Sequence, residues 1–132
     1  MSVSAVDIDA AVSSLTCLKG RTPKSEGAAL EGAFGTLMRT EECGIFTACF
    51  QGTSAWERHP NGDELVQVVK GSATVTVLHA GKENNLEMTA GSVTIVPRGA
   101  WHRFQAPDGV TVMTMTPQPT EHWREDVPPP EA

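Results

Sequence analysis

Short β-branched segments, separated at regular intervals by glycine and proline, constrain the fold of this 132-residue chain more than any other feature. Period-two alternation is clearest at residues 73–78 and 110–115. The six segments expected to be strands are residues 34–40, 44–50, 65–69, 73–78, 92–96 and 110–115. Strands of this kind, with turn residues every ~8–12 positions, predict an all-β sandwich or barrel.

Helical periodicity is weak throughout the chain. The best helical segment runs from Asp7 to Leu15, with Asp7 as a candidate N-cap. No repeat with a period of 20–50 residues is evident, and the length suits one domain.

The acidic excess of the chain lies mainly at its two ends. The formal net charge is −6, of which residues 118–132 carry −3 and residues 1–12 carry −2. The C-terminal end also contains three consecutive prolines, which favour an extended chain. We therefore expect an N-terminal arm at 1–30, a barrel at 31–117 and an acidic, proline-rich tail at 118–132. The simplest role for the tail is solubility.

Composition excludes several classes of function. A pI near 5.1 and the lack of a Lys/Arg cluster argue against nucleic-acid binding. No stretch approaches the ~18 apolar residues that cross a bilayer, and the first residues lack the features of a secretory signal. Cys17, Cys43 and Cys49 are an odd number at irregular spacing. We read them as free thiols of a cytoplasmic protein without a disulfide framework.

A turn between two predicted strands carries the first group of chemically informative residues. Glu57 and His59 are two positions apart, so they share one face of a strand. The residues 60–63 are strong turn formers, and Glu64 begins the returning strand. A hairpin of this kind brings Glu64 beside His59.

A second group lies further along the chain. A strand ends at Pro97, a turn follows to Gly99, and His102 starts the next strand. If the sheet closes on itself, His102 can reach the first hairpin. Two imidazoles and two carboxylates would then suit Mn(II), Fe(II), Ni(II) or Zn(II).

These two groups resemble the motifs of single-domain cupins, over about residues 31–117. The second half of the first cupin motif, H-x(3,4)-E-x6-G, is matched by His59, Glu64 and Gly71. The second motif, G-x5-P-x-G-x2-H, is matched at every spacing by Gly91, Pro97, Gly99 and His102. The resemblance implies a double-stranded β-helix, that is, a jelly-roll cupin barrel. It also implies that His59, Glu64 and His102 face the barrel cavity as metal ligands.

Two positions depart from the cupin pattern. Glu57 stands where the family has its first metal-binding histidine, and Ala106 stands where the second motif ends in asparagine. Glu57 would preserve a four-ligand site and favour Mn(II) or Fe(II) over softer ions. Alternatively, Glu57 is an exposed carboxylate paired with Arg58 or Arg39, or marks a site that has lost its metal. Glu64 likewise has a rival role, orienting His59 by a hydrogen bond.

Three functions remain open at this stage, because one barrel hosts many chemistries. The first is a metal-dependent enzyme that acts on a small polar organic substrate, of oxygenase, isomerase or lyase type. The second is a metal-poor module that binds or senses a small molecule without turning it over. The third is a structural role with an empty cavity. Family habit also suggests a homodimer, in which the sheets of two copies pair.

Overall fold

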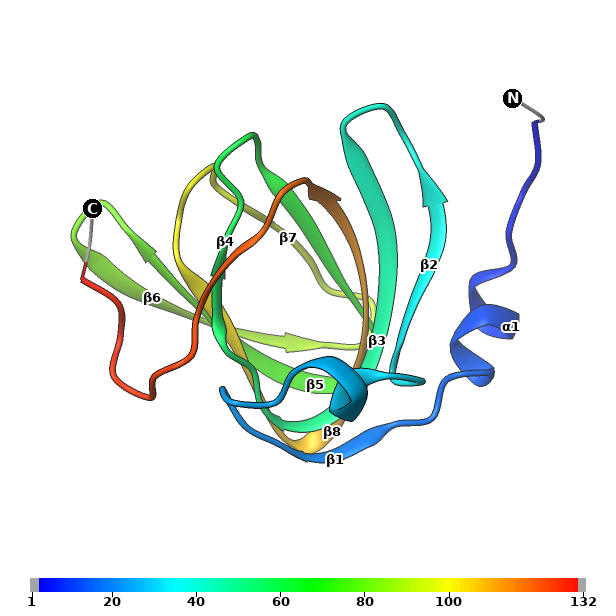
Figure 1. Cartoon of the computed structure of the whole chain (residues 1–132), viewed down its shortest axis with the longest axis horizontal. Coiled ribbons are helices and arrows are strands. Elements are labelled where there is room, and N and C mark those ends of the chain that lie inside the picture. Colours follow the sequence, from blue (N-terminus) through cyan, green and yellow to red (C-terminus); the bar gives the residue numbers. More distant parts are fainter. Residues whose placement is uncertain (1–2, 131–132) are drawn as a thin grey trace.

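The predicted β-branched segments form a single curled sheet. The structure, a computed structural model, describes residues 3–130. Within that range nine strands join into one sheet, which curls into a barrel (Figure 1). The fold is an all-β jelly-roll barrel, as the sequence predicted. The strands β2 (Phe34–Arg39), β3 (Cys43–Thr53) and β7 (Val93–Val96) lie close to their expected positions.

Two long strands form the centre of the sheet. β5 (Glu64–His79) merges the segments predicted at 65–69 and 73–78, and β8 (His102–Pro117) extends the segment predicted at 110–115. β8 pairs antiparallel with β3 and with β5. A side chain at Gly71 would clash with the carbonyl oxygen of Gly109 on β8, and the backbone there has φ +74°. A glycine therefore allows the close approach of β5 to β8 at Gly71, where the register between the two strands shifts.

The sequence did not predict β6 (Lys82–Thr89), whereas the short β4 (Trp56–Arg58) lies where Glu57 was expected on a strand. β6 is mostly polar and mostly exposed, so its β-propensity is low. It is a strand because it forms a hairpin with β5, in which Ser72 pairs with Thr89 at one end and His79 pairs with Lys82 at the other. Tertiary pairing decides its conformation.

The barrel interior holds an aliphatic core with two aromatic rings. Alternate residues of β5 and β8 point inward, and their side chains are almost fully buried. The buried cluster comprises Ala48, Phe50, Val66, Val68, Ala73, Val75, Val77, Met88, Val96, Ala100, Phe104, Ala106, Val110 and Val112. This cluster fills one part of the barrel, and some of its members, such as Phe50 and Phe104, also line a cavity in the other part.

Residues 3–30 run along the outside of the barrel and also add a strand to it. The helix α1 (Ile8–Ser13) begins at Asp7, whose carboxylate accepts a hydrogen bond from the Asp9 amide, as the sequence predicted. β1 (Leu18–Arg21) pairs in parallel with β3, and the 3-10 helix η1 (Gly27–Leu30) follows.

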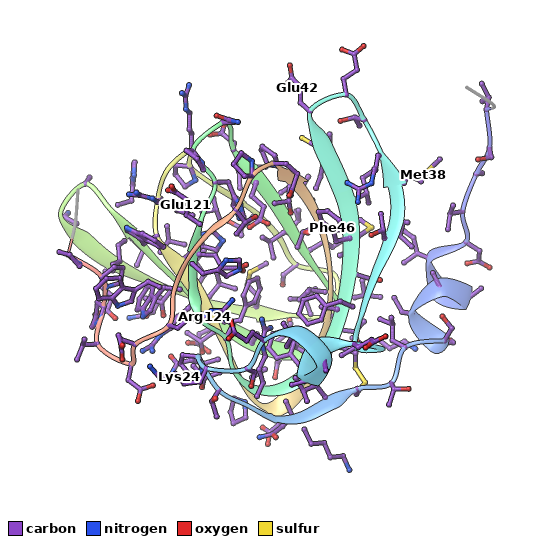
Figure 2. The ribbon with its side chains drawn as sticks, viewed as in Figure 1. Lys24, Met38, Glu42, Phe46, Glu121 and Arg124 are labelled. Carbon is purple, nitrogen blue, oxygen red and sulfur yellow. A yellow bond between two sulfur atoms is a disulfide. The ribbon has the colours of Figure 1, made fainter. Side chains whose placement is uncertain are left out.

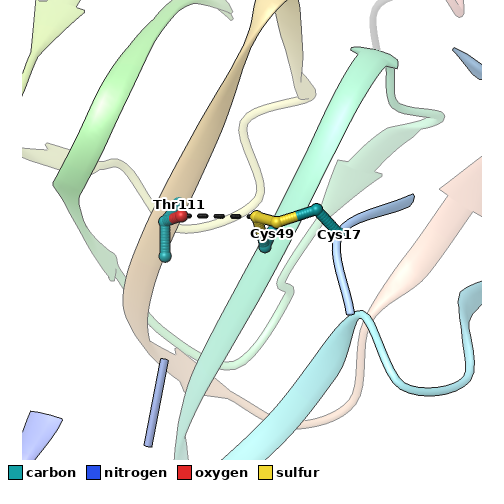
Figure 3. Close-up of a disulfide and its surroundings, with 3 residues drawn as sticks. All are labelled: Cys17, Cys49 and Thr111. Carbon is teal, nitrogen blue, oxygen red and sulfur yellow. Dashed lines mark hydrogen bonds between the residues drawn. A yellow bond between two sulfur atoms is a disulfide. The ribbon is translucent and has the colours of Figure 1, made fainter. Parts of the chain in front are cut away.

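The expectation of free cysteines is wrong for two of the three. Cys17 and Cys49 form a disulfide that joins the residue before β1 to β3, while Cys43 is free (Figure 3). The Thr111 hydroxyl on β8 donates a hydrogen bond to Cys49 Sγ. Nothing in the sequence indicated this pair, because the number of cysteines is odd and the partners are 32 positions apart. The cysteine argument for a reducing compartment is lost, and a cytoplasmic location stays a prediction.

The C-terminal residues cross the molecule after β8 (Figure 1). β9 (Glu121–Trp123) pairs antiparallel with β4. Beyond it, Arg124 lies 3.2 Å from Glu26, and Lys24 lies 3.0 Å from Glu125. Figure 2 shows Lys24 and Arg124 near each other where the two terminal segments meet. Among residues 3–130, no helix is long and apolar enough to cross a membrane.

Candidate metal centre and cavity

The turn between β4 and β5 brings His59 and Glu64 together. The predicted hairpin is wrong, because within residues 3–130 β4 pairs with β8 and β9, and β5 pairs with β6, β7 and β8. His59 follows the last residue of β4, and Glu64 is the first residue of β5. The turn is fixed from the neighbouring loop, where the Arg98 amide donates to Asp63 and the Gly99 amide donates to the His59 carbonyl. The turn chemistry of residues 60–63 therefore places the two side chains as the sequence predicted.

His102 reaches the same point from the first position of β8. Its ring is fully buried. Its Nδ1 lies 3.0 Å from the carbonyl oxygen of Ala100, and its Nε2 lies 2.9 Å from Oε1 of Glu64. Nδ1–H donates a hydrogen bond to this carbonyl, so the contact orients the ring with Nε2 facing Glu64.

The carboxylate of Glu64 lies at the centre of the group. Besides His102, it accepts a hydrogen bond of 2.6 Å from the Thr116 hydroxyl at Oε2. The same Oε2 is 3.2 Å from Nε2 of His59. The other ring nitrogen of His59 lies 3.0 Å from the hydroxyl of Thr120. Each side chain of the group is thereby oriented by a neighbour.

The pKa values of Glu64 and His102 move in opposite directions. Burial would raise the pKa of Glu64, but the hydrogen bond from His102 and the approach of the His59 ring hold it at about 2. Burial would lower the pKa of His102, but the hydrogen bond to Glu64 and its negative charge raise it above the ordinary value. Without a metal, both shifts therefore favour the charged forms of the two side chains, imidazolium and carboxylate.

The geometry fits a divalent cation. One donor atom from each of His59, Glu64 and His102 lies within 4.8 Å of the others, and all three side chains are buried. His59 Nε2 is buried and has no hydrogen-bond partner, because its approach to Glu64 is not aligned. Two imidazole nitrogens and one carboxylate oxygen suit a first-row transition metal. A cation bound between the His59 nitrogen and the Glu64 carboxylate would satisfy this buried nitrogen.

Glu57 lies near this group but is engaged elsewhere. It is half-buried and faces His102 across the pairing of β4 with β8. Its Oε2 lies 3.2 Å from Nε2 of His122 on β9. Burial would raise the pKa of Glu57, but the hydrogen bond from His122 lowers it below its ordinary value.

The alternative partners of Glu57 were therefore misidentified. Arg58 pairs with Glu121, and Arg39 lies over the ring of Phe46. Sequence reasoning gave His122 no role, because it lies in an acidic, proline-rich segment. The register of β9 against β4 places His122 opposite Glu57, and no local pattern signals that register.

A cavity of about 500 Å³ opens beside the group formed by His59, Glu64 and His102, which is called the metal group below. Glu57, His59 and Glu64 line it on one side, together with Thr116, Thr120 and His122. The lining also includes every phenylalanine of the chain, namely Phe34, Phe46, Phe50 and Phe104, together with the polar residues Thr36, Thr47, Thr114 and Gln118. Arg21 also lines it, although no sequence signal singled out that residue. A volume in the range of roughly 300–1,000 Å³ suits a small organic ligand.

Comparison with known proteins agrees with the motifs. The family model described as a cupin domain matches residues 47–116, more than half of the chain. A comparison with curated proteins finds no match.

Solved structures with the same fold share little sequence with this chain. A cupin-2 domain protein from Shewanella frigidimarina is 19% identical, with a TM-score of 0.56 over 64% of this chain and 79% of that one. A protein from Neisseria meningitidis is 13% identical, with a TM-score of 0.64 over 87% and 100%. A hydroquinone 1,2-dioxygenase from Sphingomonas, with 4-hydroxybenzoate bound, is 18% identical, with a TM-score of 0.57 over 65% of each chain. At these identities, the likeness concerns the fold alone.

Proposed function

Because the chain belongs to the cupin family, we propose that it is a metal-dependent enzyme acting on a small polar organic substrate. His59, Glu64 and His102 would hold one divalent transition metal, Mn, Fe, Ni or Zn. The observation that carries this proposal is the buried Nε2 of His59, which lacks a hydrogen bond although a carboxylate oxygen is 3.2 Å away. The Sphingomonas neighbour is a dioxygenase, which supports an oxygenase-type reaction alongside isomerase and lyase types.

The chain's own residues would prepare the site for the cation. Thr116 orients Glu64, Thr120 orients His59, and the Ala100 carbonyl directs Nε2 of His102 inward. A bound divalent ion would polarise a carbonyl or carboxylate oxygen of the substrate as a Lewis acid. His102 would lose its Nε2 proton when the ion binds, so metal and proton compete for one atom.

We propose Glu57 as the fourth ligand. It lines the same cavity as His59 and Glu64, and it faces His102 in the strand register. In this role Glu57 would exchange His122 for the cation. An oxygen ligand in place of the family's histidine favours Mn(II) or Fe(II).

The direct test is elemental analysis of protein purified without added metal. We expect near-stoichiometric Mn, Fe, Ni or Zn, and its loss in His102→Ala. His79→Ala is the control, because His79 is exposed at the end of β5. A metal-free wild-type protein whose melting temperature is unchanged by a chelator would contradict the proposal.

The alternative function is a metal-poor module that binds or senses a small molecule. It is favoured by the pairing of Glu64 with His102 and Thr116, which stabilises the carboxylate without a cation. A protein that binds small organic molecules equally well with and without metal, and that turns none over, would support this alternative.

We also propose a homodimer through the outer face of the sheet. Val93 and Ile95 on β7 are 60% and 53% exposed, and Met115 on β8 is 39% exposed. The strand register places Ile95, Leu65 and Met115 in one row. An uncharged apolar row on an antiparallel sheet suits pairing with a second copy. Light scattering should give a dimer mass, and Ile95→Lys should give the monomer mass; a monomeric wild type would refute this.

A further inference from the structure

Arg21 places a positive charge in the wall of the cavity. It is the last residue of β1, and its guanidinium lies 4.5 Å above the ring of Phe50 and 5.0 Å from that of Phe34. It lines the same cavity as Glu57, His59 and Glu64. The charge is therefore on the side of the cavity that the phenylalanines form.

Apart from the two phenylalanine rings, the guanidinium of Arg21 has no hydrogen-bond or ion-pair partner within residues 3–130. Its Nε is buried without a hydrogen bond, and no carboxylate lies within 4.0 Å of it. Glu57 is near enough to influence it, but that carboxylate is held by His122. By contrast, Arg58 and Arg124 each pair with a glutamate. A half-buried guanidinium with an unsatisfied N–H donor destabilises the fold unless an anion accepts a hydrogen bond from it.

The surrounding backbone holds Arg21 in place. Gly52 on β3 has φ +120°, and a Cβ there would clash with the Arg21 backbone. The Gly20 amide donates a hydrogen bond of 2.8 Å to the side chain of Gln51. The disulfide anchors the residue that precedes β1 to β3. Three links to one strand therefore fix the position of the arginine, as a binding residue requires.

The rest of the cavity defines the body of the ligand. Phe34, Phe46, Phe50 and Phe104 give it an apolar, aromatic wall. Thr116 and Thr120 are engaged by Glu64 and His59. The polar groups Thr36, Thr47 and Gln118 also line the cavity, but none of them carries a charge that would complement an anion. An apolar group with a single anionic end fits this combination best.

We propose that Arg21 binds the carboxylate of a small aromatic carboxylic acid, whose ring packs among the phenylalanines. This names the substrate class of the proposed enzyme and rests on that proposal for the metal beside it. The guanidinium presents a fork of N–H donors that matches a carboxylate in a bidentate pair. The carboxylate of the acid binds at β1, and a carbonyl or other oxygen substituent on the far side of its ring faces His59, Glu64 and His102, where the ion would polarise it.

Titration calorimetry with benzoate and its neutral analogue benzamide tests the assignment. In the wild type, benzoate should bind at least about tenfold more tightly than benzamide. Arg21→Gln should remove this preference by weakening benzoate alone, and Arg21→Lys should keep part of it. Arg39→Gln is the matched control, because Arg39 also lies over a phenylalanine but is exposed and outside the cavity lining. Melting temperatures would verify that every variant is folded.

Benzoate affinity that is unchanged in Arg21→Gln, or absent in the wild type, would overturn the assignment. Each titration is run on metal-loaded and on metal-free protein, and metal content is measured on the same samples. A wild type that takes up no metal would refute the metal centre, while benzoate binding to that protein would still decide the role of Arg21. The two proposals can therefore fail separately.

Discussion

Oε1 of Glu64 lies 2.9 Å from Nε2 of His102, and both side chains are buried. Glu64 begins β5 and His102 begins β8, but the two strands are antiparallel and His102 lies opposite Val77, so the curl of the sheet, and not the register of these two strands, brings the residues together. Without a metal the contact favours the charged forms of both side chains, and the same two atoms would become metal ligands. This dual role determines how stability and metal binding depend on pH.

Metal-free protein should lose stability on both sides of a pH window. Glu64 has a folded pKa of about 2 against an ordinary 4.5, so its contribution is complete above pH 4.5 and is lost as the pH falls toward 2. That contribution is roughly 3 kcal/mol. His102 has a raised pKa, so its contribution is complete below 6.5 and is lost as the pH rises through the folded value.

Urea unfolding at a series of pH values checks this prediction. Glu64→Gln should flatten the acid side of the profile, whereas Glu83→Gln, on the exposed β6, should leave it unchanged. An acid limb that survives in Glu64→Gln would assign the loss to other carboxylates.

Metal affinity should rise with pH through the raised pKa of His102. The imidazolium must give up its Nε2 proton before that nitrogen can bind a cation. Calorimetry of Mn(II) or Zn(II) binding, in buffers of different ionisation enthalpy, should show about one proton released per ion near neutral pH. Binding without proton release would mean that His102 is not a ligand.

Glu57→His should change which metal the site prefers. The substitution restores the histidine of the cupin motif and replaces an oxygen ligand by a nitrogen. We expect the ratio of Ni(II) or Zn(II) affinity to Mn(II) affinity to increase by tenfold or more, as measured in competition with a chelator. Arg58→His, which puts the same ring on the adjacent residue, should leave the ratio unchanged; equal ratios in all three proteins would exclude Glu57 as a ligand.

Removal of the disulfide should destabilise the protein by about 2–4 kcal/mol. Cys17→Ser frees β1 from β3, whereas Cys43→Ser alters a cysteine that is already free and should change the free energy of unfolding little. The measurement is denaturant unfolding, with a thiol count on unreduced, denatured protein. We expect one reactive thiol per chain, and a count of three would contradict the bond.

The three candidate ligands His59, Glu64 and His102 could be recognised in the sequence because each lies in a short local motif. His59 and Glu64 flank one turn, and His102 follows another, so motif positions and turn chemistry suffice to identify them. The segments 44–50 and 92–96 were likewise recognisable as strands, because β-branched residues and turn residues bound them. These are properties of short stretches of chain.

Long-range pairing explains what could not be predicted. Arg21, His122 and the bond between Cys17 and Cys49 reach their places through β1 and β9, whose partners lie far away in sequence. β6 is polar and became a strand only by pairing with β5. No local pattern carries the register of such pairs.

The central claim is that His59, Glu64 and His102 together bind one divalent metal ion. Anomalous diffraction from crystals of protein loaded with Mn(II) or Zn(II), recorded at the absorption edge of that metal, tests it most directly. The account predicts an anomalous peak within coordination distance of the two ring nitrogens and the carboxylate. Crystals from a metal-saturated solution with no peak at these three side chains would contradict it.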